Sequence, residues 1–368
     1  MTFTVLDAFG SPRALGAFLS LPDDVYHGDP RYNATPREDV MAGLHRRDLV
    51  RAQRVLVAVE DDLPFARVVA RRSPTLRDER GLPLGMLGFF EAMEGPEGKQ
   101  AALEVLAEGV RWLRETGAGD IIGPMEGDTW HRHRLNVGPF DDPPFLLEPW
   151  NPPFYPEIWE EAGFQMLESY ASTQVETAAA IAHLEAKATA AREAGYQVRS
   201  LDMSRFKDEL LLLYRLSTTM FAGNYLYTDI PQEEFLELYA GSRALLDPEL
   251  VLFARSPQGE DVGFLFAFPD RFRAVAAMRG KRSLLAKLRF LRHRQEAGAV
   301  DFKTVGVLPE HRRARVAALL MHEGHVRAGR KGYRLANHCL FREGNPSGDL
   351  GGPTARLLRR YHLYRWGG

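Results

Sequence analysis

Hydrophobic and polar positions follow the same order in the two halves of the chain. In the first half, apolar runs over 54–59 and 65–70 flank Asp61-Asp62, which predicts two buried strands joined by a turn. Runs over 249–254 and 262–267 repeat this arrangement in the second half, and the first run of each pair is displaced by 195 residues. This ordered self-similarity predicts an internal repeat, although identical residues are few.

Further along the chain, the displacement between corresponding positions grows to 215 residues. Phe90 then corresponds to Val305, and a helix that ends at Gly117 corresponds to one that ends at Gly332. The larger displacement indicates an insertion of about 20 residues in the second half, within 268–301. Each half predicts the element order β-α-β-β-β-α-β-α-β.

An alanine-rich stretch lies between the two copies. Apolar residues recur at helical spacing over 177–195, and Gly195 stands where a helix normally ends. We place a helical linker there, between a first domain at 1–176 and a second at 196–368. The alternative is that this helix belongs to the surface of one domain.

The composition is that of a globular protein. Of the 368 residues, 45% are hydrophobic and 26% charged, which suits two domains. A formal net charge of −2 gives no overall field that would attract nucleic acid or an anionic membrane. The single Cys339 excludes an intrachain disulfide, and we find neither a signal-peptide pattern nor an apolar run of about 18 residues. We therefore expect a soluble, cytoplasmic protein without a membrane span and without a nucleic-acid partner.

The segment 301–320 predicts a strand, a short basic loop and an amphipathic helix. Pro309 ends the strand, and Arg312, Arg313 and Arg315 lie where the loop enters the helix. Backbone N–H groups and the helix dipole at such a junction bind pyrophosphate, and arginines add bidentate contacts. The alternative is a solvated, arginine-rich helix start, and the residues alone favour neither interpretation.

This strand, loop and helix, followed by a Gly-Tyr strand and an Asn turn, resembles the acyl-CoA-binding motif of the GNAT acetyltransferase superfamily. The superfamily loop reads Arg/Gln-x-x-Gly-x-Gly/Ala. Arg312 takes the first position and Ala317 the last, whereas Arg315 replaces the middle glycine. Arg313 also stands where many members have glycine, which there lets the backbone approach the phosphates closely.

Motifs along most of the chain resemble one bacterial subgroup of tandem GNAT-like proteins. They lie at 123–125, 144–153, 262–270, 343–347 and 359–364. The fold that this resemblance implies is α/β (mixed α+β), with two tandem GNAT-like acyl-CoA acyltransferase domains. Each domain would have a mixed, mostly antiparallel central sheet flanked by helices.

The resemblance implies an N-acyltransferase that moves an acyl group, expected to be acetyl, from acyl-CoA to an amine of a small molecule or peptide by direct transfer, without a metal. Strands 300–308 and 333–340 would splay apart to hold the pantetheine arm. The implied cofactor-binding residues are Val305, Gly306, Val307, Arg312, Arg313, Ala314, Arg315, Val316, Ala317 and Asn345.

The transfer needs a base for the amine proton and a donor for the leaving thiolate. The candidate bases are His338, on the second of these strands, and Glu343 in the following turn. The tyrosine that many superfamily members have roughly seven residues after the turn Asn is Gly352 here, so Tyr361 on the last strand is the candidate donor. A strand histidine is also often structural, and Tyr361 also suits a core position.

The first copy lacks these basic residues. Glu97 and Gln100 stand where the second copy has Arg312 and Arg315, and nearby carboxylates would repel a pyrophosphate. We therefore expect a degenerate first copy that is structural or helps to form the substrate cleft.

The insertion contains the basic stretch 281–294, with six Lys or Arg residues and no acidic residue. Leu284, Leu285, Leu288 and Leu291 form a helical stripe. We expect these leucines to pack on the domain while the charges face water. The alternative partners are a membrane surface, nucleic acid or an acidic carrier protein, of which the acidic partner is preferred. Two alternatives to the enzyme remain: a catalytically inactive CoA-binding or structural protein, and a binder of an acidic partner through 281–294.

Overall fold

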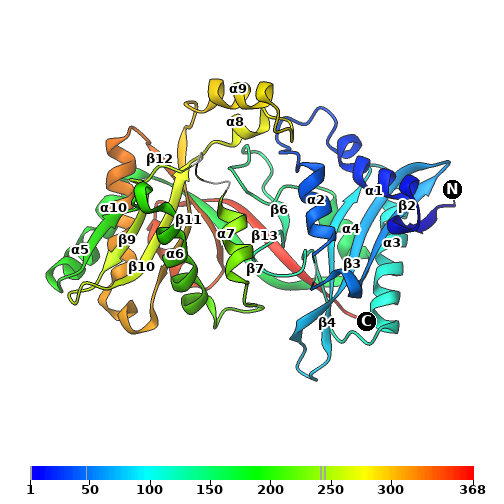
Figure 1. Ribbon diagram of the computed structural model, residues 1–368, viewed down its shortest axis with the longest axis horizontal. Coiled ribbons are helices and arrows are strands. Elements are labelled where there is room, and N and C mark those ends of the chain that lie inside the picture. The colour runs from blue at the N-terminus through cyan, green and yellow to red at the C-terminus, as the bar shows by residue number, and fades with distance from the viewer. Residues whose placement is uncertain (1, 47, 241–242, 244–245) are drawn as a thin grey trace.

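The computed structural model describes residues 2–46, 48–240, 243 and 246–368. Within them, thirteen strands form one sheet in the order β1-β2-β3-β4-β5-β13-β7-β12-β11-β10-β9-β8, with β6 paired to β13 (Figure 1). The strands are β1 (Thr4–Asp7), β2 (Gln53–Glu60), β3 (Leu63–Arg77), β4 (Pro83–Ala92), β5 (Ile121–Gly123), β6 (Leu135–Gly138), β7 (Phe164–Glu176), β8 (Gln197–Ser200), β9 (Val251–Arg255), β10 (Asp261–Pro269), β11 (Ala299–Val307), β12 (Leu335–Arg342) and β13 (Arg356–Trp366).

Helices cover the sheet in both halves. The α-helices are α1 (Pro12–Val25), α2 (Arg37–Leu44), α3 (Pro96–Glu115), α4 (Tyr155–Glu161), α5 (Thr177–Glu193), α6 (Phe206–Phe221), α7 (Gln232–Ala240), α8 (Phe272–Ala276), α9 (Leu284–His293) and α10 (Val316–Arg330). Short 3-10 helices are η1 (Ala8–Gly10), η2 (Val50–Ala52), η3 (Met203–Arg205), η5 (Pro309–Ala314) and η6 (Pro346–Gly351). The predicted order therefore recurs in both halves, except that the last helix of the second half is the 3-10 helix η6.

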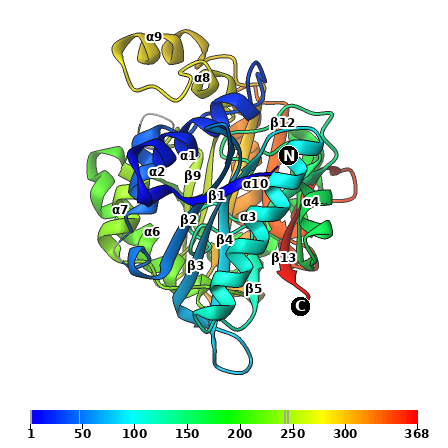
Figure 2. The same cartoon turned by 90° about the vertical axis from the view of Figure 1, so that its right-hand side faces the viewer.

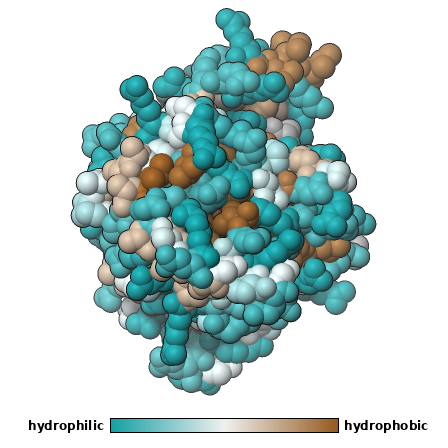
Figure 3. Space-filling view, turned by 90° about the vertical axis from the view of Figure 1, so that its left-hand side faces the viewer, coloured by the Kyte–Doolittle hydropathy of each residue, from teal (hydrophilic) through white to brown (hydrophobic). Residues whose placement is uncertain are grey.

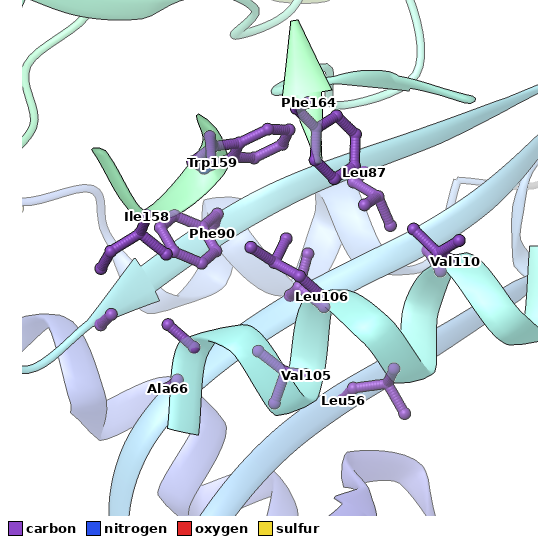
Figure 4. Close-up of a cluster of buried hydrophobic side chains, with 14 of the residues drawn as sticks. Leu56, Ala66, Leu87, Phe90, Val105, Leu106, Val110, Ile158, Trp159 and Phe164 are labelled. Atoms are coloured by element: carbon purple, nitrogen blue, oxygen red, sulfur yellow. The ribbon is translucent and has the colours of Figure 1, made fainter. Parts of the chain in front are cut away.

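The core of the first half lies between the sheet and α3, which crosses β2, β3 and β4 (Figure 2). Val105, Leu106 and Val110 recur at helical spacing, and this apolar face is buried against Leu56 and Leu87 of the strands (Figure 4). Burial of this face on the sheet stabilises the helix where its sequence predicts it.

The two halves exchange their last strands. β13, from the end of the chain, pairs with β5 of the first half on one side. On its other side it pairs along its whole length with β7, which in turn pairs with β12 of the second half. Because of this crossing, one sheet runs through both halves, and the boundary drawn between 1–176 and 196–368 stays a prediction.

The predicted linker helix packs against the second half. α5 packs along α10, where Leu184 is buried in the core of the second half and Ala188 and Ala191 contact Leu319. The small alanine side chains allow the two helices to approach closely. These contacts favour the alternative that the sequence left open, a helix on the surface of one domain, and the linker at 177–195 stays a prediction.

The insertion forms α8 and α9, as the change in displacement predicts. The expectation that its leucines pack on the domain is wrong, because Leu284 is 76% exposed and Leu291 is 50% exposed. Within α9, Ala286 is buried instead. Periodicity shows that a helix is amphipathic but does not show which face its neighbours cover.

Candidate active site

The parallel strands β11 and β12 separate partway along their length. They pair from Ala299–Leu335 to Phe302–His338, after which β12 continues alongside β7. From Lys303 to Gly306, β11 is only partly covered and keeps β10 as its neighbour on the other side. This is the splay that the resemblance predicted.

A cavity of about 900 Å³ adjoins the separation and lies between the two halves. Aromatic side chains make up much of its wall, among them Phe145, Tyr170 and Phe302. Other lining residues are Lys303 and Val305 of β11, His338 and Leu340 of β12, and Trp130 and Glu148 of the first half. Both halves therefore contribute to one space that is open to solvent on one side and has several aromatic side chains in its wall.

Glu148 is an ionisable residue of this wall that sequence reasoning did not select. Its side chain is fully buried, with Oε1 3.2 Å from Arg359 Nε. Tyr361 donates a hydrogen bond to Oε1, and the backbone N–H of Phe145 donates to Oε2 at 3.0 Å. Burial raises the pKa of Glu148 to about 7, against the opposing effect of Arg359. This carboxyl therefore changes its charge near neutral pH, as suits a general base.

Tyr361, the candidate thiolate donor, lies behind Glu148 and is absent from the cavity wall. Its side chain is fully buried in β13, and its hydroxyl lies 2.9 Å from Ser172 Oγ in addition to its bond to Glu148. Burial raises the pKa of Tyr361, so the phenol stays protonated. The Tyr361 hydroxyl thus contacts Glu148 and Ser172 and does not line the cavity, and its role as thiolate donor stays a prediction.

His338, a candidate base, lines the cavity at the point where β11 and β12 separate. Its ring stacks on Phe302 with centroids 5.6 Å apart, and its Nε2 lies 3.1 Å from His325 Nε2. Burial lowers the pKa of His338 to about 4, so the ring is neutral and a weak base at neutral pH. Burial also raises the pKa of the adjacent Cys339 thiol.

Glu343, the other candidate base, lies outside the cavity wall. Its carboxylate accepts hydrogen bonds from Ser169 at 2.5 Å and from Arg360 at 3.0 Å. The hydrogen bond from Ser169 is the main cause that lowers its pKa. Nearby, Asn345 lines the cavity and caps η6 by accepting a bond from the Ser347 N–H.

The predicted phosphate loop forms η5 and the start of α10. Arg315 takes the left-handed conformation, with φ 60° and ψ 25°, at the position where the superfamily pattern has glycine. No side chain caps the N-terminus of α10 at Val316. The backbone shape that glycine favours is thus kept with an arginine in place, and the first N–H groups of α10 are uncapped by side chains.

Arg312 points toward β11 and α6. Its Nε donates to the Val307 carbonyl at 3.1 Å, and its Nη2 donates to the Met220 carbonyl at 3.2 Å. Gly306 lies close to Met220, since a Cβ at Gly306 would lie 2.8 Å from the Met220 Cε. Arg313 and Arg315 are exposed at the loop, together with half-buried Ala314 and Ala317. The loop residues thus lie together at one end of β11, and their contact with a cofactor stays a prediction.

Within the described residues, one group of side chains has the spacing of metal ligands. It consists of Asp128, His131 and Glu234. However, Arg46 Nη1 donates to Asp128 at 2.6 Å, and its positive charge opposes a bound cation. The group is better described as an ion-pair network, of which His131 lines the cavity.

Comparisons with known proteins agree with this architecture. No family model matches the chain. A bacterial ceramide synthase of Caulobacter vibrioides is 26% identical over 281 residues, which cover 74% of this chain and 71% of that protein. A solved tandem GNAT protein from the clavulanic acid biosynthesis pathway covers 99% of this chain and 97% of its own, with a TM-score of 0.52 and 11% identity.

A second solved structure is similar over the same span. It is the GCN5-related glucosamine N-acetyltransferase region of a fungal multidomain β-N-acetylglucosaminidase, with a TM-score of 0.56 and 14% identity. The match covers 99% of this chain but 38% of the fungal one. Together with the splayed strands, these similarities show that the chain has the tandem GNAT fold.

Proposed function

We propose that the protein is an acyl-CoA-dependent N-acyltransferase whose reaction takes place in the cavity between its halves. The observation that carries this proposal is the separation of β11 and β12 beyond Phe302 and His338, which adjoins a cavity of about 900 Å³. The wall of that cavity includes a carboxyl whose pKa is about 7. Neither feature is needed for a purely structural fold.

The loop before α10 would bind the diphosphate of CoA. The N–H groups of Val316 and Ala317 lie at the positive end of the α10 dipole, and Arg313 and Arg315 carry exposed charges beside it. The pantetheine arm would then run along β11, where Val305 and Gly306 lack a strand partner on the side of β12. This direction leads the thioester toward the cavity.

Glu148 would serve as the base. The amine nitrogen attacks the thioester carbon, a C–N bond forms, and the amine proton passes to the Glu148 carboxylate. Because that side chain is fully buried within the wall, the proton would travel through one bridging water. The C–S bond then breaks, and the CoA thiolate takes up a proton from solvent. Arg359 and Tyr361 keep the carboxyl oriented throughout.

The cavity favours an acyl group longer than the expected acetyl. Its volume lies near the upper end of the range of about 300–1,000 Å³ that is usual for small-molecule sites. Acetyl would leave most of this aromatic space empty. The 26% identical relative is named as a ceramide synthase, and a ceramide is an amide of a fatty acid and a long-chain amine. We propose a fatty acyl donor and an apolar amine acceptor.

One contact favours a second candidate, a catalytically inactive CoA-binding or structural protein. The Arg312 side chain already occupies the Val307 carbonyl, a backbone group at the phosphate end of β11. If that contact persists, a pantetheine arm has one fewer backbone partner. The acidic partner considered for 281–294 has no support from the comparisons.

Release of free CoA tests the proposal directly. The purified chain is incubated with acyl-CoAs of increasing length and with amines from polar to lipid-like, and a thiol reagent measures the product. Turnover that rises with acyl length and amine hydrophobicity is expected. Calorimetric binding of acyl-CoA without turnover for any amine would instead favour an inactive CoA-binding protein. No binding at all would contradict the enzyme and favour a structural protein.

A further inference from the structure

Helix α9 presents an apolar stripe to solvent. Leu284, Leu285, Leu288 and Leu291 are 76, 58, 55 and 50% exposed. They recur at the spacing of one helix face. Figure 3 shows a hydrophobic group at the top of the molecule, where Figure 1 places α9. A soluble surface rarely gathers four exposed leucines on ten residues unless something covers them.

Positive charges border this stripe on both sides. At helical spacing, Lys287 and Arg294 flank the leucines along one edge and Arg289 flanks them along the other, while Arg292 falls within the stripe. Among the described residues, no ion pair neutralises these four side chains, and the stretch 281–294 contains no acidic residue. The outer face therefore combines a leucine centre with a basic rim.

The opposite face of α9 fixes this orientation. Ala286 is buried and Phe290 is partly buried, so the helix rests on the domain through these residues. Just before the helix, Arg282 Nη2 donates to Asp39 of α2 at 2.7 Å, and Ser283 caps the first turn by accepting from the Ala286 N–H. The leucines consequently point outward because the inner face is already in use.

We propose that α9 binds the surface of an anionic phospholipid bilayer. Leucines on one face with a basic rim are the pattern of helices that lie in the plane of a membrane interface, where the apolar face enters the acyl region and the cations meet anionic headgroups. A second copy would bring two strongly basic helices together, and nucleic acid would leave the leucines in water. The bilayer satisfies both parts of the face.

Binding there places a bilayer next to the wall of the cavity. The insertion touches the loop at 31–35, since a Cβ at Gly280 would lie 3.1 Å from Ala34. Tyr32, Asn33 and Thr35 of that same loop line the cavity. The loop at 31–35 therefore lines the proposed reaction space and also contacts the insertion that carries α9.

Vesicle sedimentation of the full-length protein tests the inference without any acyl-CoA. One set of vesicles contains phosphatidylcholine alone and the other also contains phosphatidylglycerol. We expect binding to the anionic vesicles that is weakened by salt. The triple variant L284S/L288S/L291S should still fold because it changes exposed residues. Because it removes the apolar face, it should bind the vesicles more than tenfold less tightly. R289Q/R292Q should weaken binding to the anionic vesicles and should not change binding to the phosphatidylcholine vesicles.

A matched control separates this face from general surface hydrophobicity. Leu63 is 64% exposed at the start of β3, and Leu63→Ser should leave vesicle binding unchanged. In L288W, tryptophan emission should shift to shorter wavelength when anionic vesicles are added.

Several results would overturn the inference. They are sedimentation with neither set of vesicles, equal binding by the leucine variant, and an unshifted L288W emission. Two further results would show that a different partner covers the leucine face of α9. One is a dimer that the leucine variant converts to a monomer, and the other is an acidic carrier protein that binds α9 while vesicles do not.

Discussion

The two halves differ in what lies beside the same pair of parallel strands. In the first half, β4 and β5 pair in parallel at Gly85–Ile121 and Met86–Ile122, which corresponds to the pairing of β11 with β12 at the displacement of 215. In the second half, the space beyond the pairing adjoins the cavity. In the first half, side chains of α4 fill it.

Two aromatic residues of α4 fill the space beyond the pairing of β4 and β5. Tyr155 Oη accepts a hydrogen bond from the Ala92 N–H at 2.7 Å, and Ala92 corresponds to Val307 of the second half. Trp159 packs so closely on β5 that a Cβ at Gly123 would lie 2.5 Å from its ring (Figure 4). A backbone group that would face a pantetheine arm in the second half is therefore already satisfied within the first.

The difference depends on the segment that precedes the last strand of each half. The first half has the aromatic helix α4 there, whereas the second has the short η6, which Asn345 caps and which contains small residues. One strand arrangement can thus become a packed core or a binding cleft, according to which side chains follow it.

Removing the Trp159 side chain, which packs against the first-half sheet, should produce the largest change in stability. Trp159→Ala deletes a fully buried ring from the first-half core and should lower the free energy of unfolding by about 3–5 kcal/mol. Denaturant titration measures it. Trp366→Ala, at the half-buried end of β13, is the matched control and should cost less. Equal losses in the two variants would mean that Trp159 does not seal the first half.

The next prediction tests whether Glu148 of the first half is the base for the reaction beside the second half. Glu148→Gln keeps the shape but removes the charge change, so kcat should fall by about a hundredfold. In the unmodified protein, kcat/KM should rise as pH rises through about 7, because Glu148 must lose its proton to act. The variant should lose this rise.

The exposed Glu115→Gln on α3 is the control for that experiment and should leave the rate unchanged. An unchanged rate and pH profile in Glu148→Gln would refute the assignment. If Glu343→Gln or His338→Ala then abolished turnover, the base would be the one predicted from the sequence.

A smaller effect concerns the basic loop that distinguishes the second half. Arg313→Glu reverses an exposed charge and should weaken acyl-CoA binding by about tenfold, since a charge-assisted contact contributes roughly 1.5–3 kcal/mol. Arg330→Glu makes the same reversal at the far end of α10 and should change affinity little. Calorimetry compares the two, and equal weakening would indicate a general charge effect.

The smallest effect concerns the backbone at Arg315. Since its φ is 60°, Arg315→Gly should relieve strain and raise the free energy of unfolding by up to about 1 kcal/mol. Arg313 lies in η5 without a positive φ, so Arg313→Gly should lower stability instead. Thermal unfolding measures the stability change of each variant. A loss of stability in Arg315→Gly would contradict the proposed backbone strain.

The sequence predicts much of the fold because periodicity and turn residues are local signals. Both copies, the insertion and the loop at 309–315 lie where the pattern indicates. The strand exchange of β7 and β13 leaves no such signal, since an apolar strand does not specify its neighbour. The exposed face of α9 escaped prediction for the same reason.

The site was harder to predict than the fold. Glu148 lies in an irregular loop of the first half and meets Arg359 and Tyr361 through the exchanged strand β13, more than half the chain away in sequence. Its one signal was its place in the segment 144–153, which carried the resemblance but no chemical role. Sequence reasoning sought bases next to the cofactor loop and so selected Glu343, which is ion-paired outside the cavity.

The central claim is that the second half alone binds acyl-CoA. Calorimetric titration with a non-transferable acyl-CoA analogue tests it most directly. We predict one site per chain, lost in R312E/R313E/R315E and retained in the first-half variant E94Q/E97Q. Two sites per chain, no site, or a site that survives the arginine replacements would contradict the account.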